Sequence, residues 1–267
     1  MIAVILAGCA ASTPVDRAQA LVRMHRENEA VAMLATHLGR HPDDLPARRL
    51  YVRVLAYTGD IDGARREVTA LEERMPNDPV PYIELGHAFE LGHRFDEALA
   101  AYDSAASVAP ASPVGPREGG MRAARWGEHE EASVRLEEAV RRGARDAETY
   151  HALGLVRLHA RDFDGANEAY RKGLAADPRS LENLLGLASV AVVQGEPAAA
   201  LRAYDALLAQ KPDHAPAELG RAWSLAKLGR APEAERALDR AAELGAPAAN
   251  VAKQRAAIRS GALGPAR

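Results

Sequence analysis

The sequence predicts an all-α solenoid of about seven helix–turn–helix repeats in a right-handed superhelix, followed by a C-terminal capping helix. Two series of residues share a 34-residue interval, which is the length of one helix–turn–helix unit in a stacked array. The first series consists of alanines, namely Ala30, Ala64, Ala98, Ala132, Ala166, Ala200 and Ala234. The second consists of prolines, namely Pro42, Pro76, Pro110, Pro178 and Pro212, with Ala144 and Ala246 at the two remaining places. Because both series keep one interval, alanine abundance alone does not account for it.

The prolines fall near the end of each unit and divide the chain into repeats. Each repeat is expected to contain two amphipathic helices. In the third repeat, Leu85 and Phe89 share one face of a helix over 82–89, and Tyr102 lies on the apolar face of a helix over 96–102. The predicted repeats are residues 11–44, 45–78, 79–112, 113–146, 147–180, 181–214 and 215–248.

Local signals set the expected ends of these helices. Asp96, after Phe95, is predicted to cap the second helix of the third repeat, and Pro110 to stop it. In the fourth repeat, Pro113-Val114-Gly115-Pro116 and Gly119-Gly120 weaken the first helix. Two interpretations remain open for this segment: a bend in the solenoid, or a shorter helix.

The two ends of the array differ from its middle. The solenoid is assigned to residues 15–248, and Arg17 replaces a core leucine in a divergent first repeat. Residues 249–267 are predicted to form a capping helix and a frayed tail. The polar helix over 251–258 would cover the open end of the array, and residues 261–265 would fray.

The repeats resemble the tetratricopeptide repeat (TPR) family over nearly all of residues 11–248. The family has a small residue on the first helix, matched here by Ala18, Gly86, Gly120, Gly154, Ala188 and Ala222, while Val52 departs from the pattern. The family's alanine on the second helix matches the alanine series. Its bulky residue four positions later is matched by Leu34, Val68, Tyr102, Leu136, Tyr170, Tyr204 and Leu238. Small residues are required because two helices approach closely only where one presents a methyl group or a hydrogen.

The first nine residues resemble a bacterial lipoprotein signal. Leu6-Ala7-Gly8-Cys9 is similar to the lipobox, whose cysteine is acylated and becomes the mature N-terminus. No Lys or Arg precedes the short apolar run, which departs from that pattern and would fit a start site further upstream. Cys9 is therefore the expected lipid-attachment residue, with residues 10–14 as a short tether. The alternative is an ordinary apolar N-terminus with an incidental cysteine.

Composition and motifs restrict the function. The formal net charge of −3 gives no basic field that would attract nucleic acid, so we expect no nucleic-acid partner. The single cysteine excludes an internal disulfide and a cysteine-ligated metal site. We find no His-Glu-x-x-His, Gly-x-Ser-x-Gly or phosphate-binding glycine loop, and predict no catalytic residues, no cofactor and no metal site.

Two pairs of histidines have spacings that could bring their side chains together. His37 and His41 stand four residues apart and could share a metal, but they lack an obvious third ligand and are interpreted as surface residues. His151 and His159 could face one surface near Glu148. For that group a pH-sensitive contact is favoured over an enzymatic role.

In TPR proteins the first helices line a concave groove that holds a protein or peptide segment. The resemblance implies that this groove is polar toward one end and apolar toward the other. Acidic or polar partner groups are expected at the arginines and apolar anchors near Trp223. For Leu185, Val193 and Leu219, packing within or between repeats is the competing interpretation. The predicted groove residues are Arg49, Arg53, Tyr57, His87, Arg117, Met121, Arg125, His151, Leu155, His159, Leu185, Val193, Leu219, Trp223 and Lys227.

The resemblance therefore predicts a non-catalytic protein-binding scaffold. With an acylated Cys9 it would be an envelope lipoprotein, anchored in the outer membrane and facing the periplasm, that assists assembly of an envelope complex. Pilotins for type IV pilus secretins are the nearest specific match, beside the TPR lipoprotein of the β-barrel assembly machine and adaptors for peptidoglycan enzymes. Two alternatives remain: a soluble cytoplasmic adaptor, and a non-catalytic subunit of an enzyme or regulatory complex. The TPR clamp for acidic C-termini needs asparagines where this chain has Leu50, Arg53 and Glu84, so docking to heat-shock chaperones is not expected.

Overall fold

The structure is a computed structural model that describes residues 13–264. Cys9, the signal-like segment and residues 10–12 of the predicted tether lie outside the described residues. Within residues 13–264 the chain is all-α and without strands, as predicted. The helices are α1 (Pro14–Arg23), α2 (Glu27–Arg40), α3 (Leu45–Tyr57), α4 (Ile61–Arg74), α5 (Val80–Leu91), α6 (Phe95–Val108), α7 (Val114–Trp126), α8 (His129–Arg141), α9 (Ala147–His159), α10 (Phe163–Ala176), α11 (Leu181–Val193), α12 (Pro197–Gln210), α13 (Ala215–Lys227), α14 (Ala231–Glu243) and α15 (Ala248–Arg259).

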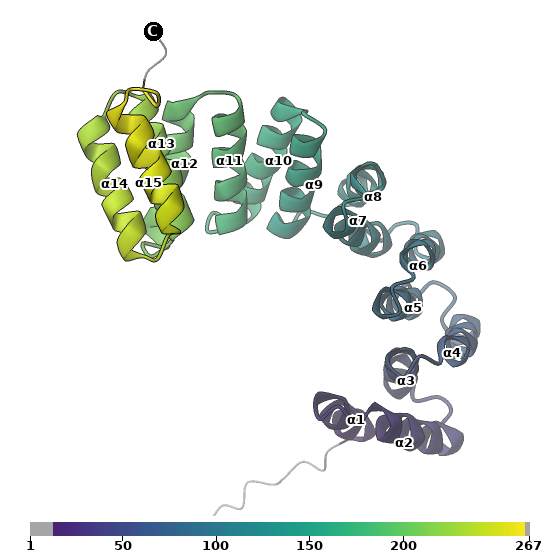
Figure 1. The fold of residues 1–267 in the computed structure, drawn as a ribbon. Helices are drawn as coiled ribbons and strands as arrows, with labels where there is room; N and C mark the ends of the chain where they lie inside the picture. The colour runs from purple at the N-terminus through teal and green to yellow at the C-terminus, as the bar shows by residue number, and fades with distance from the viewer. Residues whose placement is uncertain (1–12, 265–267) are drawn as a thin grey trace, which may run out of the picture. The chain divides into compact units, whose positions relative to one another are not determined.

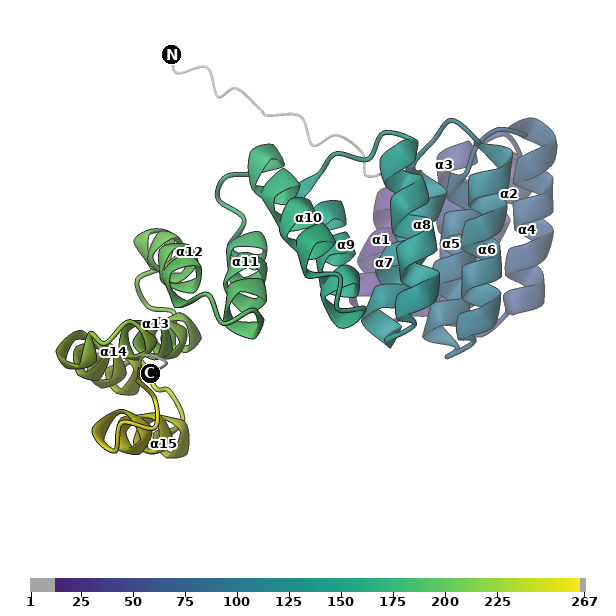
Figure 2. The same cartoon turned by 90° about the horizontal axis from the view of Figure 1, so that it is seen from above.

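The helices form seven successive hairpins and a final single helix, divided between two compact units. The units meet in sequence at Gly119 and Gly120, inside α7. In the first unit α1, α3 and α5 form one layer and α2, α4 and α6 the other (Figures 1 and 2). In the second unit α9 packs against both α10 and α11, and α15 packs against α13 and α14. We call the odd-numbered helix of each hairpin its first helix and the even-numbered one its second.

A left-handed residue closes the turn inside every hairpin. In the turn after α11 this residue is Gly195, with φ of 71°. Glycine adopts this conformation without the steric cost that other residues incur. Three hairpins nevertheless use a residue with a side chain there. The complete series keeps the 34-residue interval: His25, Gly59, His93, Gly127, Arg161, Gly195 and Gly229.

The small and bulky series meet in the core. Tyr170 of α10 is 1% exposed, and a Cβ added to Gly154 of α9 would lie 2.6 Å from Tyr170 Cε1. On the other side, a Cβ on Gly186 of α11 would lie 2.5 Å from Tyr170 Cζ. The ring is therefore held between two helices that belong to consecutive repeats. Burial raises the pKa of Tyr170 to about 12.

Two local expectations are corrected by the structure. Asp96 is not the cap of α6: the helix begins one residue earlier, at Phe95, so Asp96 lies in its first turn. The cap position belongs to Arg94, whose guanidinium pairs with Glu97 at 2.6 Å and makes no capping bond. The shorter-helix interpretation of the fourth repeat is wrong, because α7 has the same 13 residues as α3 and α9.

The described ends of the chain are tied to the first and last hairpins. Thr13 and Asp16 form a reciprocal capping box, so Pro14, assigned to the tether, is the first residue of α1. At the other end Leu263 lies in the segment expected to fray. Its N–H donates to the Ala257 carbonyl at 2.9 Å, and its side chain packs against the last core cluster.

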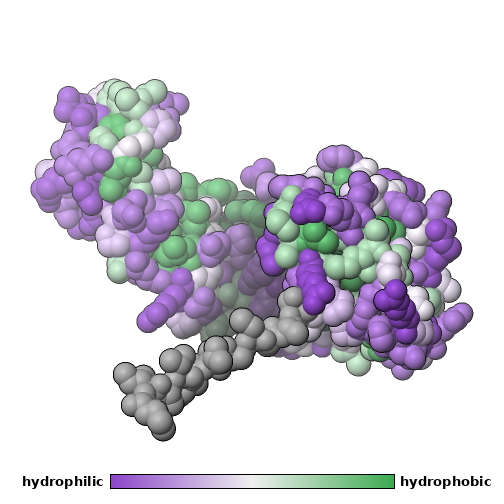
Figure 3. Space-filling view, turned by 90° about the horizontal axis from the view of Figure 1, so that it is seen from below, coloured by the Kyte–Doolittle hydropathy of each residue, from purple (hydrophilic) through white to green (hydrophobic). Residues whose placement is uncertain are grey.

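The face shown in Figure 3 is mainly polar. Figure 3 shows hydrophilic residues over most of the visible face, with apolar residues exposed in smaller patches between them. Among the described helices, none combines the length and the apolar character that crossing a bilayer would take.

Candidate functional site

In the first unit, four of the five predicted groove residues are engaged by carboxylates of the same unit. Arg53 of α3 pairs with Glu84 of α5, and His87 of α5 lies 3.7 Å from a carboxylate oxygen of Glu118 in α7. The two pairs occupy equivalent positions in successive repeats. His87 follows Arg53 by 34 residues, and Glu118 follows Glu84 by the same interval. Glu84 is only 6% exposed, so the Arg53 guanidinium compensates a carboxylate that is largely removed from water.

Two other predicted arginines are also paired. Arg49 of α3 pairs with Asp78, in the loop before α5, and Arg117 lies 2.9 Å from Glu118. Tyr57, at the end of α3, is 46% exposed. The first helices of this unit therefore carry positive groups whose charge is already balanced within the unit. Their predicted contact with an acidic partner would have to displace these carboxylates.

The second unit has a hollow on its first helices, with a volume of about 570 Å³. It brings together four of the predicted site residues, Met121 and Arg125 of α7 and His151 and Leu155 of α9. The remaining lining residues come from the same helices, from the loop between α10 and α11 and from the first turn of α11: Ala124, Ala147, Glu148, Ala152, Asp177, Ser180 and Glu182.

The hollow combines an apolar floor with charged groups. Met121 and Leu155 are half-buried, whereas Arg125, Glu148 and Glu182 are exposed. No carboxylate among the described residues lies within ion-pair distance of Arg125. The arrangement can therefore receive an apolar side chain together with charged groups of either sign, at different points of its rim.

His151 lies on one wall of this hollow, near the ring of Tyr170, at 6.0 Å between centroids. Burial lowers the pKa of His151, and the nearby carboxylates Glu182 and Glu148 only partly oppose that effect. The neutral imidazole is thus favoured in the folded protein.

The hollow exists because the cross-repeat ion pairs of the first unit are replaced. The positions equivalent to Arg53 and Glu84 are Met121 and Ala152, and one repeat later Leu155 and Gly186. The methyl group of Ala152 leaves open the space that a long carboxylate side chain fills in the first unit, whereas at Gly186 the Tyr170 ring takes that space.

The other predicted residues of the second unit lie along the same row of first helices. Leu185 is 37% exposed and Val193 58%, so neither is core. Trp223 packs partly against the core cluster of α11 and α12. Lys227, at the end of α13, has no ion-pair partner among the described residues.

Two of the predicted residues contact neighbouring helices of the same unit. Leu219 packs against the C-terminal cluster, and its carbonyl accepts a hydrogen bond from Gln254 Nε2 of α15 at 3.3 Å. The His159 ring stacks on the His129 ring of α8, at 4.1 Å between centroids and 15° between planes.

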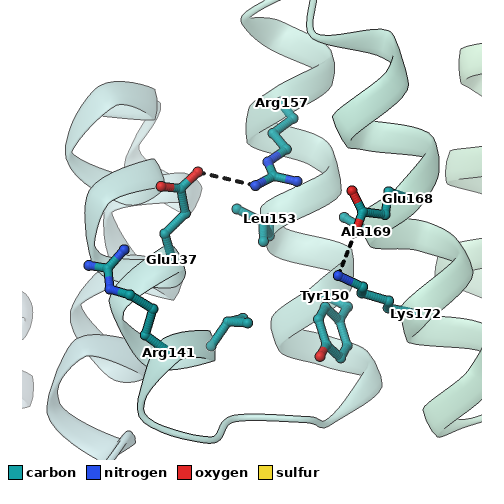
Figure 4. Close-up of a pocket in the computed structure, with 9 residues that line it drawn as sticks. Glu137, Arg141, Tyr150, Leu153, Arg157, Glu168, Ala169 and Lys172 are labelled. Carbon is teal, nitrogen blue, oxygen red and sulfur yellow. Dashed lines mark hydrogen bonds and ion pairs between the residues drawn. The ribbon is translucent and has the colours of Figure 1, made fainter.

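A second, smaller hollow of about 270 Å³ lies on the opposite face of α9 (Figure 4). Tyr150 and Leu153 line it between two ion pairs, Glu137 with Arg157 at 3.2 Å and Glu168 with Lys172 at 2.6 Å. Helical residues are spaced by about 100°, so these side chains point away from His151 and Leu155. Since its charged rim is paired, this hollow offers fewer groups to a ligand.

Besides three alanines, sequence reasoning missed three polar lining residues, Asp177, Ser180 and Glu182. They lie at the loop and start of α11, where Ser180 caps the helix by accepting from the Asn183 N–H at 3.3 Å. A polar residue before a first helix is recognisable as a cap from the sequence, but its place at the rim of a hollow depends on the packing of α9 against α11.

Of the pair His37 and His41, the first is engaged with a carboxylate. His37 Nε2 lies 2.7 Å from Asp44 Oδ2, and the His37 and His41 rings lie 4.8 Å apart. Over residues 13–264, no three His, Cys, Asp or Glu side chains gather as a metal site would require.

Part of the chain is similar in sequence to known proteins. A family model described as tetratricopeptide repeat matches residues 185–260. The heat-shock protein cognate (HSC) co-chaperone sgt12 of Aspergillus fumigatus is 29% identical over 119 residues, which are 43% of this chain and 35% of that protein. The chain thus spans about a third of the length of that curated relative.

Solved structures share the fold at low sequence identity. The C-terminal part of a TPR repeat-containing protein from Cytophaga hutchinsonii is 14% identical with a TM-score of 0.68, over 90% of this chain and 98% of that one. YrrB, described as a TPR protein with an unusual peptide-binding site, is 20% identical with a TM-score of 0.63, over 71% and 97%. MamA is 22% identical with a TM-score of 0.59, over 62% and 91%.

Proposed function

We propose that this chain, a tetratricopeptide-repeat protein by its fold and by the family model that matches residues 185–260, is a non-catalytic scaffold that binds a segment of another protein. The binding surface is the first-helix face of the second unit. We define this face by residues on α7, α9, α11 and α13: Met121, Arg125, Glu148, His151, Leu155, Glu182, Leu185, Val193, Trp223 and Lys227.

The hollow of about 570 Å³ over Met121 and Leu155 is the observation that carries this proposal. Its apolar floor suits the side chain of a partner, because burying apolar area contributes about 25 cal/mol per Å². Exposed Leu185 and Val193 extend the apolar surface along α11. YrrB, which has this fold, is described as having a peptide-binding site, which supports the same use here.

Site-specific photo-crosslinking in living cells tests the surface. A photoreactive phenylalanine analogue replaces Leu185 on the first-helix face or, as the matched control, Val134 of α8. Both side chains are exposed and apolar, at 37% and 65%, but Val134 lies on a second helix. We expect a discrete crosslinked partner from position 185 and none from position 134. Equal crosslinking from both positions would remove the basis for assigning the surface.

We further propose that the scaffold is anchored to the cell envelope through an acylated Cys9. The support is the sequence Leu6-Ala7-Gly8-Cys9, which resembles a lipobox. Several acyl chains on one residue would give stable anchoring, since each buried CH₂ contributes about 0.8 kcal/mol. Radiolabelled palmitate should enter the native protein and not the Cys9→Ser variant. Equal labelling of both, or of neither, would refute the anchor.

An anchored scaffold would assist assembly of an envelope complex, and a pilotin-like role for a type IV pilus secretin is the specific form of this proposal. The protein crosslinked from position 185 decides among the candidates. A secretin supports the pilotin role, whereas a cytoplasmic protein together with unlabelled Cys9 supports the soluble adaptor. An enzyme subunit as the partner would support the non-catalytic subunit.

A relationship to HSC co-chaperones receives less support from this chain. The matched protein is named as a co-chaperone, but the groove positions that would hold an acidic C-terminus contain Arg53 and Glu84. These two residues pair with each other, so Arg53 is already neutralised.

A further inference from the structure

Chemical character changes in a fixed order along the first helices of the second unit. Carboxylates lie before or at the helix starts, at Glu148 for α9 and at Asp177 and Glu182 for α11. Cations lie at the helix ends, at Arg125 for α7 and Lys227 for α13. We call the first group the acidic edge and the second the basic edge.

Between these two edges the equivalent middle positions are apolar on three of the four first helices, and Ser189 occupies that position on α11. Met121, Leu155 and Trp223 occupy equivalent middle positions on α7, α9 and α13. Because equivalent positions are 34 residues apart, each row crosses successive helices at a similar height. The face is therefore a mainly apolar stripe, interrupted at Ser189, with negative groups along one side on α9 and α11 and positive groups along the other on α7 and α13.

Charged side chains on both edges are at least partly exposed to solvent. The carboxylate of Glu182 is exposed and accepts a hydrogen bond from Ser180 Oγ at 3.2 Å. Arg125 and Lys227 have no ion-pair partner among residues 13–264. The first unit contrasts with this arrangement, because its Arg53 is paired with Glu84.

We propose that the occupant of this face is an amphipathic α-helix that lies across the first helices, with basic residues on one flank and acidic residues on the other; this rests on the proposed function. Its apolar stripe contacts Met121, Leu155 and Trp223, its basic flank meets the acidic edge, and its acidic flank meets the basic edge. An extended segment presents side chains in two opposite directions, whereas a helix presents three distinct faces, as this surface requires.

The dimensions of the face fix the length of the helix. Packed helices lie about 8–10 Å apart, so a row of four first helices spans roughly 27 Å or more between the outer axes. At 1.5 Å per residue, a helix of about 18 residues covers that distance.

The two edges also fix the direction of the bound helix. Reversing a helix while its apolar stripe stays on the surface exchanges its two flanks. A helix with segregated charges therefore matches both edges in one direction only, whereas a helix with mixed flanks has no preferred direction.

Three fluorescein-labelled peptides of about 18 residues, the length worked out above, test the occupant against the full chain by fluorescence anisotropy. All carry one leucine stripe. The first has Lys on one flank and Glu on the other, the second mixes the same residues on both flanks, and the third has Lys on both. Circular dichroism first establishes that the peptides have equal helicity. We expect the segregated peptide to bind at least about tenfold more tightly than either control, and this difference to shrink in roughly 0.5 M salt because salt screens exposed charges.

Charge reversal in the protein tests the direction. Replacing both Glu148 and Glu182 with Lys, or both Arg125 and Lys227 with Glu, should weaken binding of the segregated peptide at least about fivefold, because each edge then repels the flank that it faces. Combining all four substitutions should restore binding with the helix reversed. All four side chains are at least partly exposed, so thermal melting should show an unchanged fold.

Fluorescence energy transfer from Trp223 measures the direction in which the peptide helix is bound. Trp126→Phe leaves Trp223 as the single tryptophan, and a dansyl acceptor is placed at either end of the segregated peptide. The end that quenches Trp223 more strongly should exchange in the fourfold variant.

Equal affinity for the segregated and mixed peptides, or an unchanged direction in the fourfold variant, overturns the inference. Absence of binding by all peptides overturns the helical occupant as well. In that case, a partner crosslinked from position 185 would still support the proposed scaffold function. The absence of any crosslink from that position would refute the scaffold function as well.

Discussion

Gly186→Ala tests whether the close helix packing depends on small residues. The added Cβ would lie 2.5 Å from Tyr170 Cζ, well inside van der Waals contact. The ring cannot move toward α9, because Gly154 contacts its other side. Overpacking a rigid core costs about 1–3 kcal/mol, and a site closed on both sides belongs in the upper part of that range. The better helix propensity of alanine returns up to about 1 kcal/mol.

The expected net effect is a destabilisation of about 1–2 kcal/mol, or a fall in Tm of roughly 3–6 °C for a chain of this size. Circular dichroism during urea and thermal unfolding measures it. Gly39→Ala is the matched control, since Gly39 lies in α2 and a Cβ there has no atom within 4 Å. This control should be stabilised by a few tenths to about 1 kcal/mol.

A second variant supplies a rescue that the chain itself suggests. In the preceding repeat the positions of Tyr170 and Gly186 are occupied by Leu136 and Ala152. Adding Tyr170→Leu to Gly186→Ala should therefore cost at least about 1 kcal/mol less than the sum of the two single changes. If Gly186→Ala stabilises the protein as much as Gly39→Ala, the steric account of the small residues is wrong.

Other predictions concern the turns, the ion pairs and the hollow. Gly195→Ala should destabilise by about 1 kcal/mol because φ is positive there, whereas Arg161→Gly, at the equivalent position, should be neutral or stabilising; urea unfolding compares them. Arg53→Ala should cost about 1–3 kcal/mol by leaving buried Glu84 without its partner, and adding Glu84→Gln should recover part of this loss in the same assay. Burial lowers the pKa of His151, so the unfolded chain binds more protons below pH ~6.5 and stability falls on acidification; His151→Gln should flatten that decline in unfolding measured from about pH 7 to 5.

The repeat architecture was predictable because its signals are periodic. Pro42, Pro76 and Pro178 each follow the end of a second helix by two residues, where a helix can no longer continue. Ala30 and Ala166 are fully buried, as close packing of a hairpin requires. Each signal is repeated several times along the chain, so a single departure does not hide it.

Individual helix ends were less predictable. Asp96 has the chemistry of a cap, but Arg94 occupies the cap position and pairs with Glu97 instead. Gly119 and Gly120 lower helix propensity, yet α7 keeps its full length. Buried Gly120 meets Leu136, so tertiary contact outweighs the local preference of glycine.

The site was predictable only in part, because position on a helix does not reveal what a neighbouring helix presents. Family positions brought Met121 and Leu155 to one hollow. They also selected Arg49 and Arg53, which are paired with carboxylates that lie 29 and 31 residues further along the chain. The sequence shows an arginine and a glutamate 31 residues apart, at Arg53 and Glu84. Their ion pair could therefore have been predicted from the sequence.

Arg53 and Glu84 are 31 residues apart and lie on neighbouring first helices. Residue pairs at this spacing differ in chemical character between the two units. In the first unit, Arg53 and Glu84 form an ion pair between two first helices, so their charges neutralise each other. In the second unit the equivalent residues are Leu155 and Gly186, which cannot form an ion pair. An apolar surface with exposed charges therefore remains for a partner. Introducing the ion pair there, as Leu155→Arg with Gly186→Glu, would crowd Tyr170 against the new glutamate.

Met121→Arg with Ala152→Glu is the better experiment, because it builds the bridge where the second-helix residue is an aliphatic one, Leu136. In the first unit the position equivalent to Leu136 is Val68, which is also aliphatic and accompanies Glu84. The double variant should keep the helical content measured by circular dichroism while reducing crosslinking from position 185, because the new ion pair would fill the hollow. Undiminished crosslinking would show that the bridge and the binding surface are unrelated.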